Sequence, residues 1–270
     1  MLKGLFEHRS LIYQLAVRDL KIRYRKPILS FFWMLIIPIS TAFIYKVLFS
    51  DFMRVSNGSY PFFIHLLTAL LPWTYFASSL QTATLSILSS KNIINQISFP
   101  KYLLPVSVVA ANLINFLPTL LVLSGFFVVF HIKIGWLIFL LPAVILIHTA
   151  LITGLSFAVS ALQVIHRDIE YVVQILLTAL FFLTPGVYTL DQLTERASPL
   201  FVKIYMLNPL VGILNLYRVV FIGQYIGNMP EEINLINILV VPVLFSISAL
   251  FMGYYIFHKL ETKFSDYLNI

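Results

Sequence analysis

The chain has 270 residues, of which 60% are hydrophobic and only 11% are charged. Because a soluble domain carries about 25% charged residues, this composition excludes a soluble globular protein and indicates a membrane protein. The absence of cysteine excludes a disulfide framework, a thiolate metal site and a cysteine nucleophile.

The first predicted element is a helix over residues 4–26, which is too polar to cross a bilayer. At helical spacing its apolar residues share one face and its polar residues lie opposite. The apolar set is Phe6, Ile12, Tyr13, Ala16, Val17 and Leu20, and the polar set is Glu7, Gln14, Arg18 and Lys21. The pattern favours an interfacial helix on the inner leaflet, with its basic residues near lipid phosphates. A basic leader that only sets the topology is the alternative.

Six apolar runs are long enough for transmembrane helices, each of which needs about 20 residues. They cover residues 28–49, 61–82, 103–130, 135–163, 170–190 and 235–257. None of them alternates like the strands of an outer-membrane barrel. The sequence therefore predicts an all-α integral membrane protein with six transmembrane helices, folded as a single domain over 1–270.

The distribution of lysine and arginine predicts the orientation in the membrane, because these residues concentrate in cytoplasmic segments. With the N-terminus inside, about two thirds of the 18 lysine and arginine residues lie on the inner side. Seven of them precede the first span: Lys3, Arg9, Arg18, Lys21, Arg23, Arg25 and Lys26. We expect both termini to be cytoplasmic.

The stretch between the fifth and sixth spans breaks this simple pattern. Thr184-Pro185-Gly186 should kink or end the fifth helix. Two short apolar runs follow at about 199–207 and 210–222, separated by Asn208-Pro209, and neither is long enough to span. Such segments are tolerated where they lie on or dip back into the outer face, surrounded by protein or water. Residues 191–222 are therefore a candidate external gate.

Several kinds of chemistry are missing from the chain. All 11 acidic residues lie at span ends or in loops, so an intramembrane ion relay lacks its carboxylates. His65 and His148 lie within spans and are interpreted as hydrogen-bonding a neighbouring helix, with a proton relay as the alternative. No carboxylate cluster suggests a membrane enzyme, and no phosphate-binding Gly-x4-Gly-Lys-Ser/Thr motif is present. If ATP powers this protein, another subunit binds it.

Aromatic residues are abundant, with 24 Phe, 14 Tyr and 3 Trp, and they recur near span ends. Interfacial anchoring explains most of them. The remainder are candidates to line a path for sugar rings, which bind aromatic faces without fixing one register. The candidates are Tyr24, Phe31, Trp33, Trp73, Phe76, Phe181 and Tyr188.

Five short blocks, in chain order, carry a resemblance to a known family. They are 18–25 leading to Trp33 and Pro38; 71–76; 98–101 with Leu104-Pro105; Arg167-Asp168-Ile169 followed by Thr184-Pro185; and 207–209 with Arg218. Together they resemble the ABC-2 type permeases that export cell-surface polysaccharides such as O-antigen, capsule and teichoic acid. Ser30 departs from the pattern, because the family often has glycine there.

The resemblance implies a transport subunit without a catalytic site, a metal or a cofactor of its own. Such a permease forms a homodimer with two copies of an ABC ATPase subunit, which binds ATP and magnesium. The substrate is an undecaprenyl-linked polysaccharide, and the location is the cytoplasmic (inner) membrane. No nucleic acid is involved. Alternatives are the same architecture with another cargo, an ion-coupled carrier or channel, and a membrane transferase for lipid-linked sugars.

The resemblance also implies roles for particular residues. Coupling to the ATPase falls on the stretch 84–100 and the next cytoplasmic loop, with the candidates Lys91, Asn92, Asn95, Gln96, Arg167 and Asp168. The interfacial helix is expected to approach a lipid pyrophosphate with Arg18, Lys21, Arg23 and Arg25, since charge-assisted contacts to phosphate favour arginine. Ordinary binding to anionic lipid is the alternative for these four cations. The candidate gate residues are Asn208, Pro209 and Arg218.

Overall fold

The computed structural model describes residues 4, 7–23, 27–52, 61–186, 188, 190, 193–194, 197–223 and 235–268. The predicted site residues Tyr24 and Arg25, and the side chains of Arg23 and Phe31, lie outside the described residues. So does most of the predicted gate segment before residue 197.

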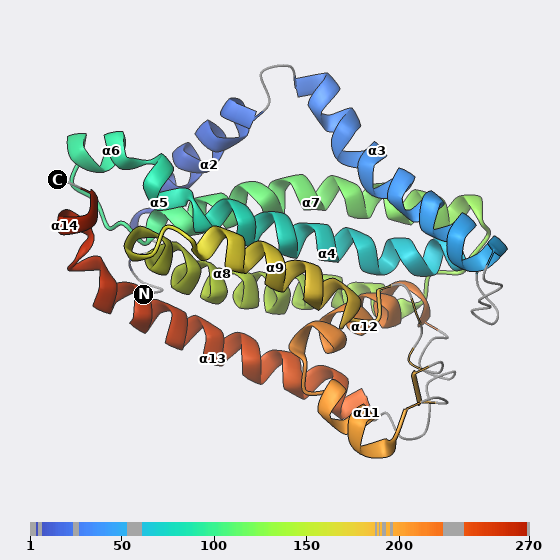
Figure 1. The fold of residues 1–270 in the computed structure, drawn as a ribbon. Helices are drawn as coiled ribbons and strands as arrows, with labels where there is room; N and C mark the ends of the chain where they lie inside the picture. The colour runs from blue at the N-terminus through green and yellow to red at the C-terminus, as the bar shows by residue number, and fades with distance from the viewer. Residues whose placement is uncertain are drawn as a thin grey trace.

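All secondary structure in the described part of the chain is helical, which confirms the predicted all-α fold. The helices are α2 (Arg9–Arg23), α3 (Pro27–Tyr45), the π-helix η1 (Lys46–Phe52), α4 (Phe62–Thr84), α5 (Ser86–Ser89), α6 (Lys91–Gln96), α7 (Leu103–Val129), the 3-10 helix η2 (Trp136–Leu140), α8 (Leu141–Ile165), α9 (Ile169–Phe182), α11 (Pro199–Tyr205), α12 (Pro209–Phe221), α13 (Leu235–Glu261) and α14 (Phe264–Leu268). In Figure 1, α4, α7, α8, α9 and α13 run alongside one another as a bundle.

Five helical segments of the described residues are long and apolar enough to cross a membrane: 35–52, 62–84, 103–129, 136–165 and 238–261. The count becomes six if α11 and α12, which meet at 85°, form one broken span. The predicted fifth span, 170–190, is where sequence and structure differ. Its helix α9 has only 14 residues, because the chain turns at Leu183–Gly186 and Pro185 cannot continue a helix.

The two helices that follow the turn differ in their surroundings. Both begin with proline at the first position behind a polar cap, Ser198 for α11 and Asn208 for α12, which is the usual start signal of a helix. Every residue of α12 from Leu210 to Phe221 is buried, and α12 packs on α4, α8 and α13. The second predicted apolar run therefore dips into the bundle and does not lie on its surface.

Close helix contact in the core depends on small residues. A Cβ atom on Gly253 of α13 would meet the carbonyl oxygen of Gly154 in α8, and a Cβ on Gly154 would meet the backbone of Ala249. Small residues at such crossings let two backbones approach closely. The α8–α13 pair is thus the tightest helix crossing that the glycines identify.

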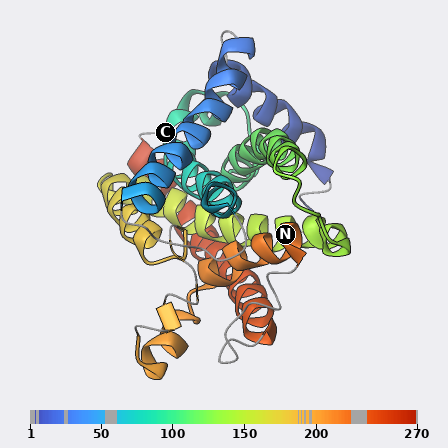
Figure 2. The same ribbon diagram turned by 90° about the vertical axis from the view of Figure 1, so that its right-hand side faces the viewer.

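The N-terminal helix α2 packs on α7, but the face that it buries is only partly the apolar face predicted from the sequence. Leu15 and Ala16 are 6% and 1% exposed, whereas Tyr13 is 67% exposed. The predicted apolar face is therefore divided, with Ala16 turned toward protein and Tyr13 turned outward. Figure 2, which looks along the bundle, shows α2 and α3 on one side and α11 on the opposite side.

One end of the bundle, on the left in Figure 1, gathers segments that are far apart in sequence. It holds α6, the turn between α8 and α9, and α14, while α11 and α12 lie toward the other end. Both groups of residues expected to contact an ATPase thus lie at the same end of the molecule.

Candidate functional site

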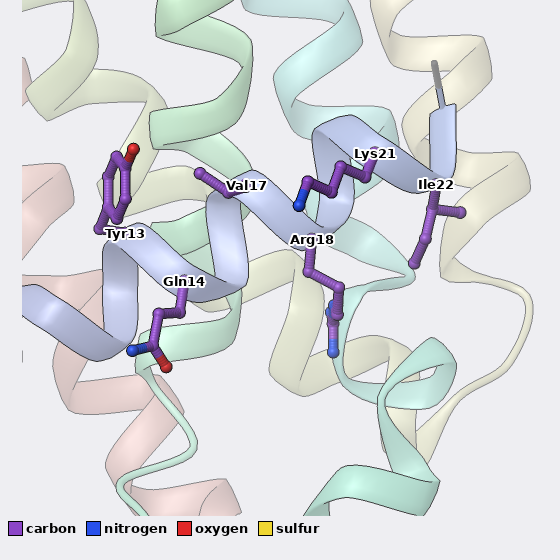
Figure 3. Close-up of a pocket in the computed structure, with 6 residues that line it drawn as sticks. All are labelled: Tyr13, Gln14, Val17, Arg18, Lys21 and Ile22. Carbon is purple, nitrogen blue, oxygen red and sulfur yellow. The ribbon is translucent and has the colours of Figure 1, made fainter. Parts of the chain in front are cut away.

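The outward face of α2 carries an open groove of about 590 Å³. Its described lining comes from positions that repeat every four residues along one helix face: Tyr13, Gln14, Val17, Arg18, Lys21 and Ile22 (Figure 3). This lining includes two cations and no acidic residue. The arrangement can receive an anionic group through the charged ends of Arg18 and Lys21, with apolar carbon beside them.

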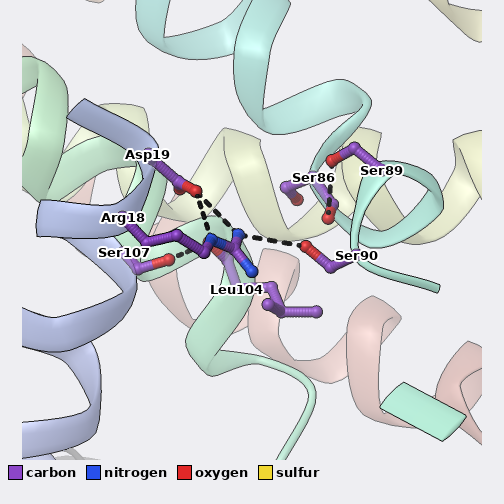
Figure 4. A network of polar contacts seen from close by, with 7 residues as sticks. All are labelled: Arg18, Asp19, Ser86, Ser89, Ser90, Leu104 and Ser107. Atoms are coloured by element: carbon purple, nitrogen blue, oxygen red, sulfur yellow. Dashed lines mark hydrogen bonds and ion pairs between the residues drawn. The ribbon is translucent and has the colours of Figure 1, made fainter. Parts of the chain in front are cut away.

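Arg18 also joins α2 to the neighbouring helices (Figure 4). Its Nε and Nη2 atoms donate to Oδ1 of Asp19 at 3.0 and 2.7 Å, and Nη2 donates to Oγ of Ser90 at 3.3 Å. The side chains of Arg18 and Asp19 are 30% and 12% exposed. Ser90 is buried and stands between α5 and α6 as the N-cap residue of α6. The sequence pattern pointed to Arg18 but not to Asp19 and Ser90, because their contacts with Arg18 form only on folding.

The helix α6 holds the predicted coupling residues Lys91, Asn92, Asn95 and Gln96, and none of its six described residues is buried. A second cavity of about 250 Å³ lies beside α6, lined by residues 94–99 and Lys101. A short helix that buries none of its side chains gains little from packing within its own chain. Its exposed surface is available to a partner protein.

Gln163 shapes the second predicted coupling segment, the turn between α8 and α9. Its Nε2 donates to the carbonyl oxygen of Arg167 at 2.8 Å, and its Oε1 accepts from the backbone N–H of Glu170 at 2.8 Å. Gln163 is buried, whereas Arg167 and Asp168 are exposed. Gln163 was not among the predicted coupling residues, although a glutamine in the last turn of an apolar helix is a visible signal.

Arg218 lies near the end of the predicted gate segment 191–222 and is fully buried in α12. Its Nη2 donates to the carbonyl oxygens of Pro185 and, at 3.2 Å, Gly186, and its Nη1 donates to Oδ1 of Asn215 at 3.4 Å. The carbonyls of Pro185 and Gly186 belong to the turn that ends α9. The guanidinium therefore fixes α12 to that turn, using the fork of donors that arginine provides.

The side chains of Asn208 and Tyr188 also donate hydrogen bonds to backbone carbonyls at the end of α9. Asn208 donates from Nδ2 to the carbonyl oxygen of Leu183 at 3.4 Å, while its Oδ1 accepts from Leu210 N–H at 3.0 Å. Tyr188 donates to the carbonyl oxygen of Phe182 at 3.2 Å and lies 2.9 Å, hydroxyl to hydroxyl, from Tyr205 of α11. The candidate gate residues Asn208 and Arg218 are thus both attached to the end of α9, and Pro209 follows Asn208 as the first residue of α12.

The predicted channel aromatics occupy two different environments. Trp73 and Phe76 of α4 lie 5.6 Å apart between ring centroids, and Trp73 lies 5.5 Å from Phe181 of α9. Phe76 is 1% exposed, so within one chain it is a core residue. Trp33 on α3 is instead exposed. A channel-lining role for these aromatics stays a prediction.

His148 is buried beside the same core residues. His148 Nδ1 is 3.4 Å from the hydroxyl of Tyr217 in α12, and its ring lies edge-on to that of Tyr75. The contact with Tyr217 fits the interpretation of His148 as a hydrogen-bonding residue between neighbouring helices.

Comparison with known proteins identifies the family. Residues 10–222 match the family model described as ABC-2 type transporter. The chain is 31% identical over 256 residues to the O-antigen export system permease protein RfbA of Myxococcus xanthus, covering 93% of this chain and 95% of that protein. It is 28% identical over 261 residues to a protein of the same name from Klebsiella pneumoniae, covering 96% and 95%. With most of its length matched and a helical bundle suited to the membrane, the chain belongs to the ABC-2 type transporter family as an integral membrane transport subunit.

Proposed function

We propose that this chain is the membrane-spanning permease of an ABC exporter that moves a lipid-linked, O-antigen-like polysaccharide from the cytoplasmic to the outer side of the membrane. The observation that carries the proposal is the similarity, along nearly the whole chain, to proteins named O-antigen export permeases. Similarity of that extent includes the transmembrane helices and the segment that holds Arg218, where a cargo would pass.

The family implies an ABC ATPase partner. Because the chain lacks a phosphate-binding loop, ATP and its magnesium ion would be bound by that separate subunit. Its proposed docking surface combines α6 with the α8–α9 turn, at the end of the bundle that holds both (Figure 1). We propose two permease chains with two ATPase subunits, in the inner membrane, with both permease termini on the ATPase side.

The polysaccharide carrier lipid would approach α2 from the inner leaflet. Arg18 and Lys21 in the α2 groove supply donors for its phosphates, and Arg23 and Arg25 continue the basic sequence beyond them. The attached glycan would then leave past α11 and α12. Arg218 and Asn208 hold α12 to the end of α9. An outward path therefore requires this attachment to move or to border the channel.

The test is to delete the gene for this chain in its native host and to measure both the surface polysaccharide and its lipid-linked precursor. Loss of the surface polysaccharide with accumulation of the precursor in the inner leaflet is the expected result. Loss of the polymer itself would overturn export in favour of synthesis. A normal polysaccharide with loss of teichoic acid, a lipid or drug resistance would assign another cargo to the same permease.

The ATPase partner is tested by purifying the chain from native membranes in mild detergent. A stoichiometric partner with a phosphate-binding loop and ATP hydrolysis in the same sample is expected. A chain that purifies alone from membranes in which transport is intact would contradict the proposed complex and would favour a carrier or channel.

A further inference from the structure

The α2 groove and the start of α6 are separate parts of the proposed machinery, one for the substrate and one for the ATPase. A single side chain touches both. Arg18 lines the groove and also donates to the hydroxyl of Ser90, the N-cap residue of α6. Any displacement of α6 must therefore either move the guanidinium or break this hydrogen bond.

Asp19 explains why the guanidinium lies where it does. Neighbouring residues on a helix point in different directions, so Arg18 has to bend back to reach the carboxylate of Asp19. The Asp19 side chain is 12% exposed, and its Oδ2 has no hydrogen-bond partner among the described residues. A carboxylate that has lost most of its water needs a cation beside it. Asp19 therefore holds one edge of the guanidinium against the body of the bundle.

One nitrogen of the guanidinium, Nη1, remains available with its two N–H groups. Arginine has five N–H donors, and the contacts to Asp19 and Ser90 use Nε and Nη2. Nη1 makes no hydrogen bond to any residue that the structure describes, and Figure 3 shows the side chain extending away from the helix axis beside Lys21. Phosphate oxygens can accept from these two N–H groups in a charge-assisted hydrogen bond.

We infer that Asp19 and Ser90 are positioning residues for Arg18, and that they make the affinity of the α2 groove for a phosphate or pyrophosphate headgroup depend on the position of α6. The inference rests on the proposed function, in which ATP binding to the partner moves α6. In the nucleotide-free complex, Ser90 holds Arg18 at the groove. Movement of α6 after ATP binding withdraws the guanidinium and weakens the hold on the headgroup, which then leaves toward the channel.

The inference is tested by measuring headgroup binding in the full complex in two nucleotide states. The chain has no cysteine, so Ile22→Cys in the groove accepts a fluorophore before assembly with the ATPase. The complex is placed in phosphatidylcholine nanodiscs, and farnesyl pyrophosphate is the probe. With ATP bound to a hydrolysis-deficient ATPase, the labelled complex should bind the probe about tenfold or more weakly than without nucleotide, as expected for one lost charge-assisted contact.

Single substitutions distinguish the effect of the Arg18–Ser90 hydrogen bond from general effects on folding. Ser90→Ala should bring the ratio of the two affinities close to one. The matched control is Ser89→Ala, because Ser89 donates to the carbonyl of Ser86 one position away from the link (Figure 4), and its ratio should equal that of the starting protein. Asp19→Asn should lower the affinity of the nucleotide-free complex by about threefold, because it weakens the charge-assisted contacts that hold the Arg18 guanidinium in place.

Each outcome decides the inference. Equal affinities in the two nucleotide states, an unchanged ratio in Ser90→Ala, or the absence of probe binding would overturn it. Displacement of the probe by inorganic pyrophosphate would assign recognition to the phosphates alone, and failure of displacement would assign it to the lipid-linked form; both support the groove. If the complex exports polysaccharide but binds the probe equally well in both nucleotide states, only the proposed role of the Arg18–Ser90 contact is rejected. If the two affinities differ as expected but no polysaccharide is exported, only the proposed cargo is rejected.

Discussion

At the scale of single residues, the most consequential side chain is Arg218, a cation that the fold buries completely. Burial of a charge is expensive unless hydrogen bonds satisfy it. Arg218 meets this requirement in part, because its Nη2 donates to backbone carbonyls of another segment and its Nη1 donates to Asn215 of its own helix. The side chain therefore contributes to the attachment of α12 and is sensitive to substitution.

The first prediction concerns that attachment. Arg218→Leu should lower the midpoint of thermal unfolding in detergent, because it leaves the buried carbonyls of Pro185 and Gly186 without their donor, at a cost of about 1–3 kcal/mol for each. The midpoint of Arg218→Lys should lie between those of the starting protein and Arg218→Leu, since lysine keeps a charged donor but lacks the fork of donors. Lys203→Gln, at an exposed cation in α11, is the control and should have no effect. An unchanged midpoint in Arg218→Leu would show that the attachment adds nothing to stability.

The second prediction concerns the crossing of α8 and α13. Gly253→Ala should destabilise the protein by about 1–3 kcal/mol, because its Cβ would meet the Gly154 carbonyl oxygen. Gly125→Ala on α7 is the matched control, since nothing lies within 4 Å of a Cβ there and alanine favours a helix. Thermal unfolding of the two variants in the same detergent provides the comparison. Equal midpoints would mean that the crossing can separate without cost.

At the scale of elements, connections between helices carry the contacts proposed for the partner. The turn between α8 and α9 is held from inside by one glutamine, while Arg167 and Asp168 face outward. A rigid turn can transmit a push from an ATPase, whereas a loose one absorbs it. Gln163 is therefore expected to act on coupling through the turn, without touching the partner.

The third prediction follows from this arrangement. Gln163→Leu should reduce stimulation of ATP hydrolysis by substrate severalfold, because the Arg167 carbonyl and the Glu170 N–H lose their partner. Gln174→Leu, at an exposed position of α9, should keep full stimulation. ATP hydrolysis by the assembled complex, with and without substrate, is the measurement. Full stimulation in Gln163→Leu would contradict a coupling role for this turn.

At the scale of the whole molecule, the interior of the single chain is occupied. The helix α12 is buried from Leu210 to Phe221, and Phe76 and Trp73 pack in the same core. Protein cores are as densely packed as organic crystals, so a polysaccharide cannot pass through this interior without displacing side chains. A path formed between two copies of the chain avoids that cost.

The fourth prediction is therefore a permease dimer. Native mass spectrometry of the complex should find two copies of this 30.9 kDa chain together with two ATPase subunits. An excess of detergent that separates the copies should abolish transport after reconstitution, while restoring the dimer should restore it. A complex with one permease chain that still transports would require the path to open inside the bundle.

Hydrophobic runs in the sequence were sufficient to predict the positions of the long apolar helices. The helices α4, α7 and α13 lie where runs of about 20 apolar residues predicted them, because a bilayer requires backbone groups to be satisfied within the helix. Asn208-Pro209 likewise marked the start of α12, since capping and proline geometry act locally. The sequence predicted too long a helix for α9, because the apolar run continues past the turn at Pro185.

The amino-acid sequence by itself determined that this protein is an all-α membrane protein, and it contained the motifs of its family. Only the tertiary structure decided that α12 enters the bundle, that Arg218 binds the end of α9, and that Arg18 joins Asp19 to Ser90. The physical reason is the range of the interactions. Hydrophobic length and helix capping act within one continuous segment of the chain. These hydrogen bonds instead join residues up to 72 positions apart and exist only after the helices have packed.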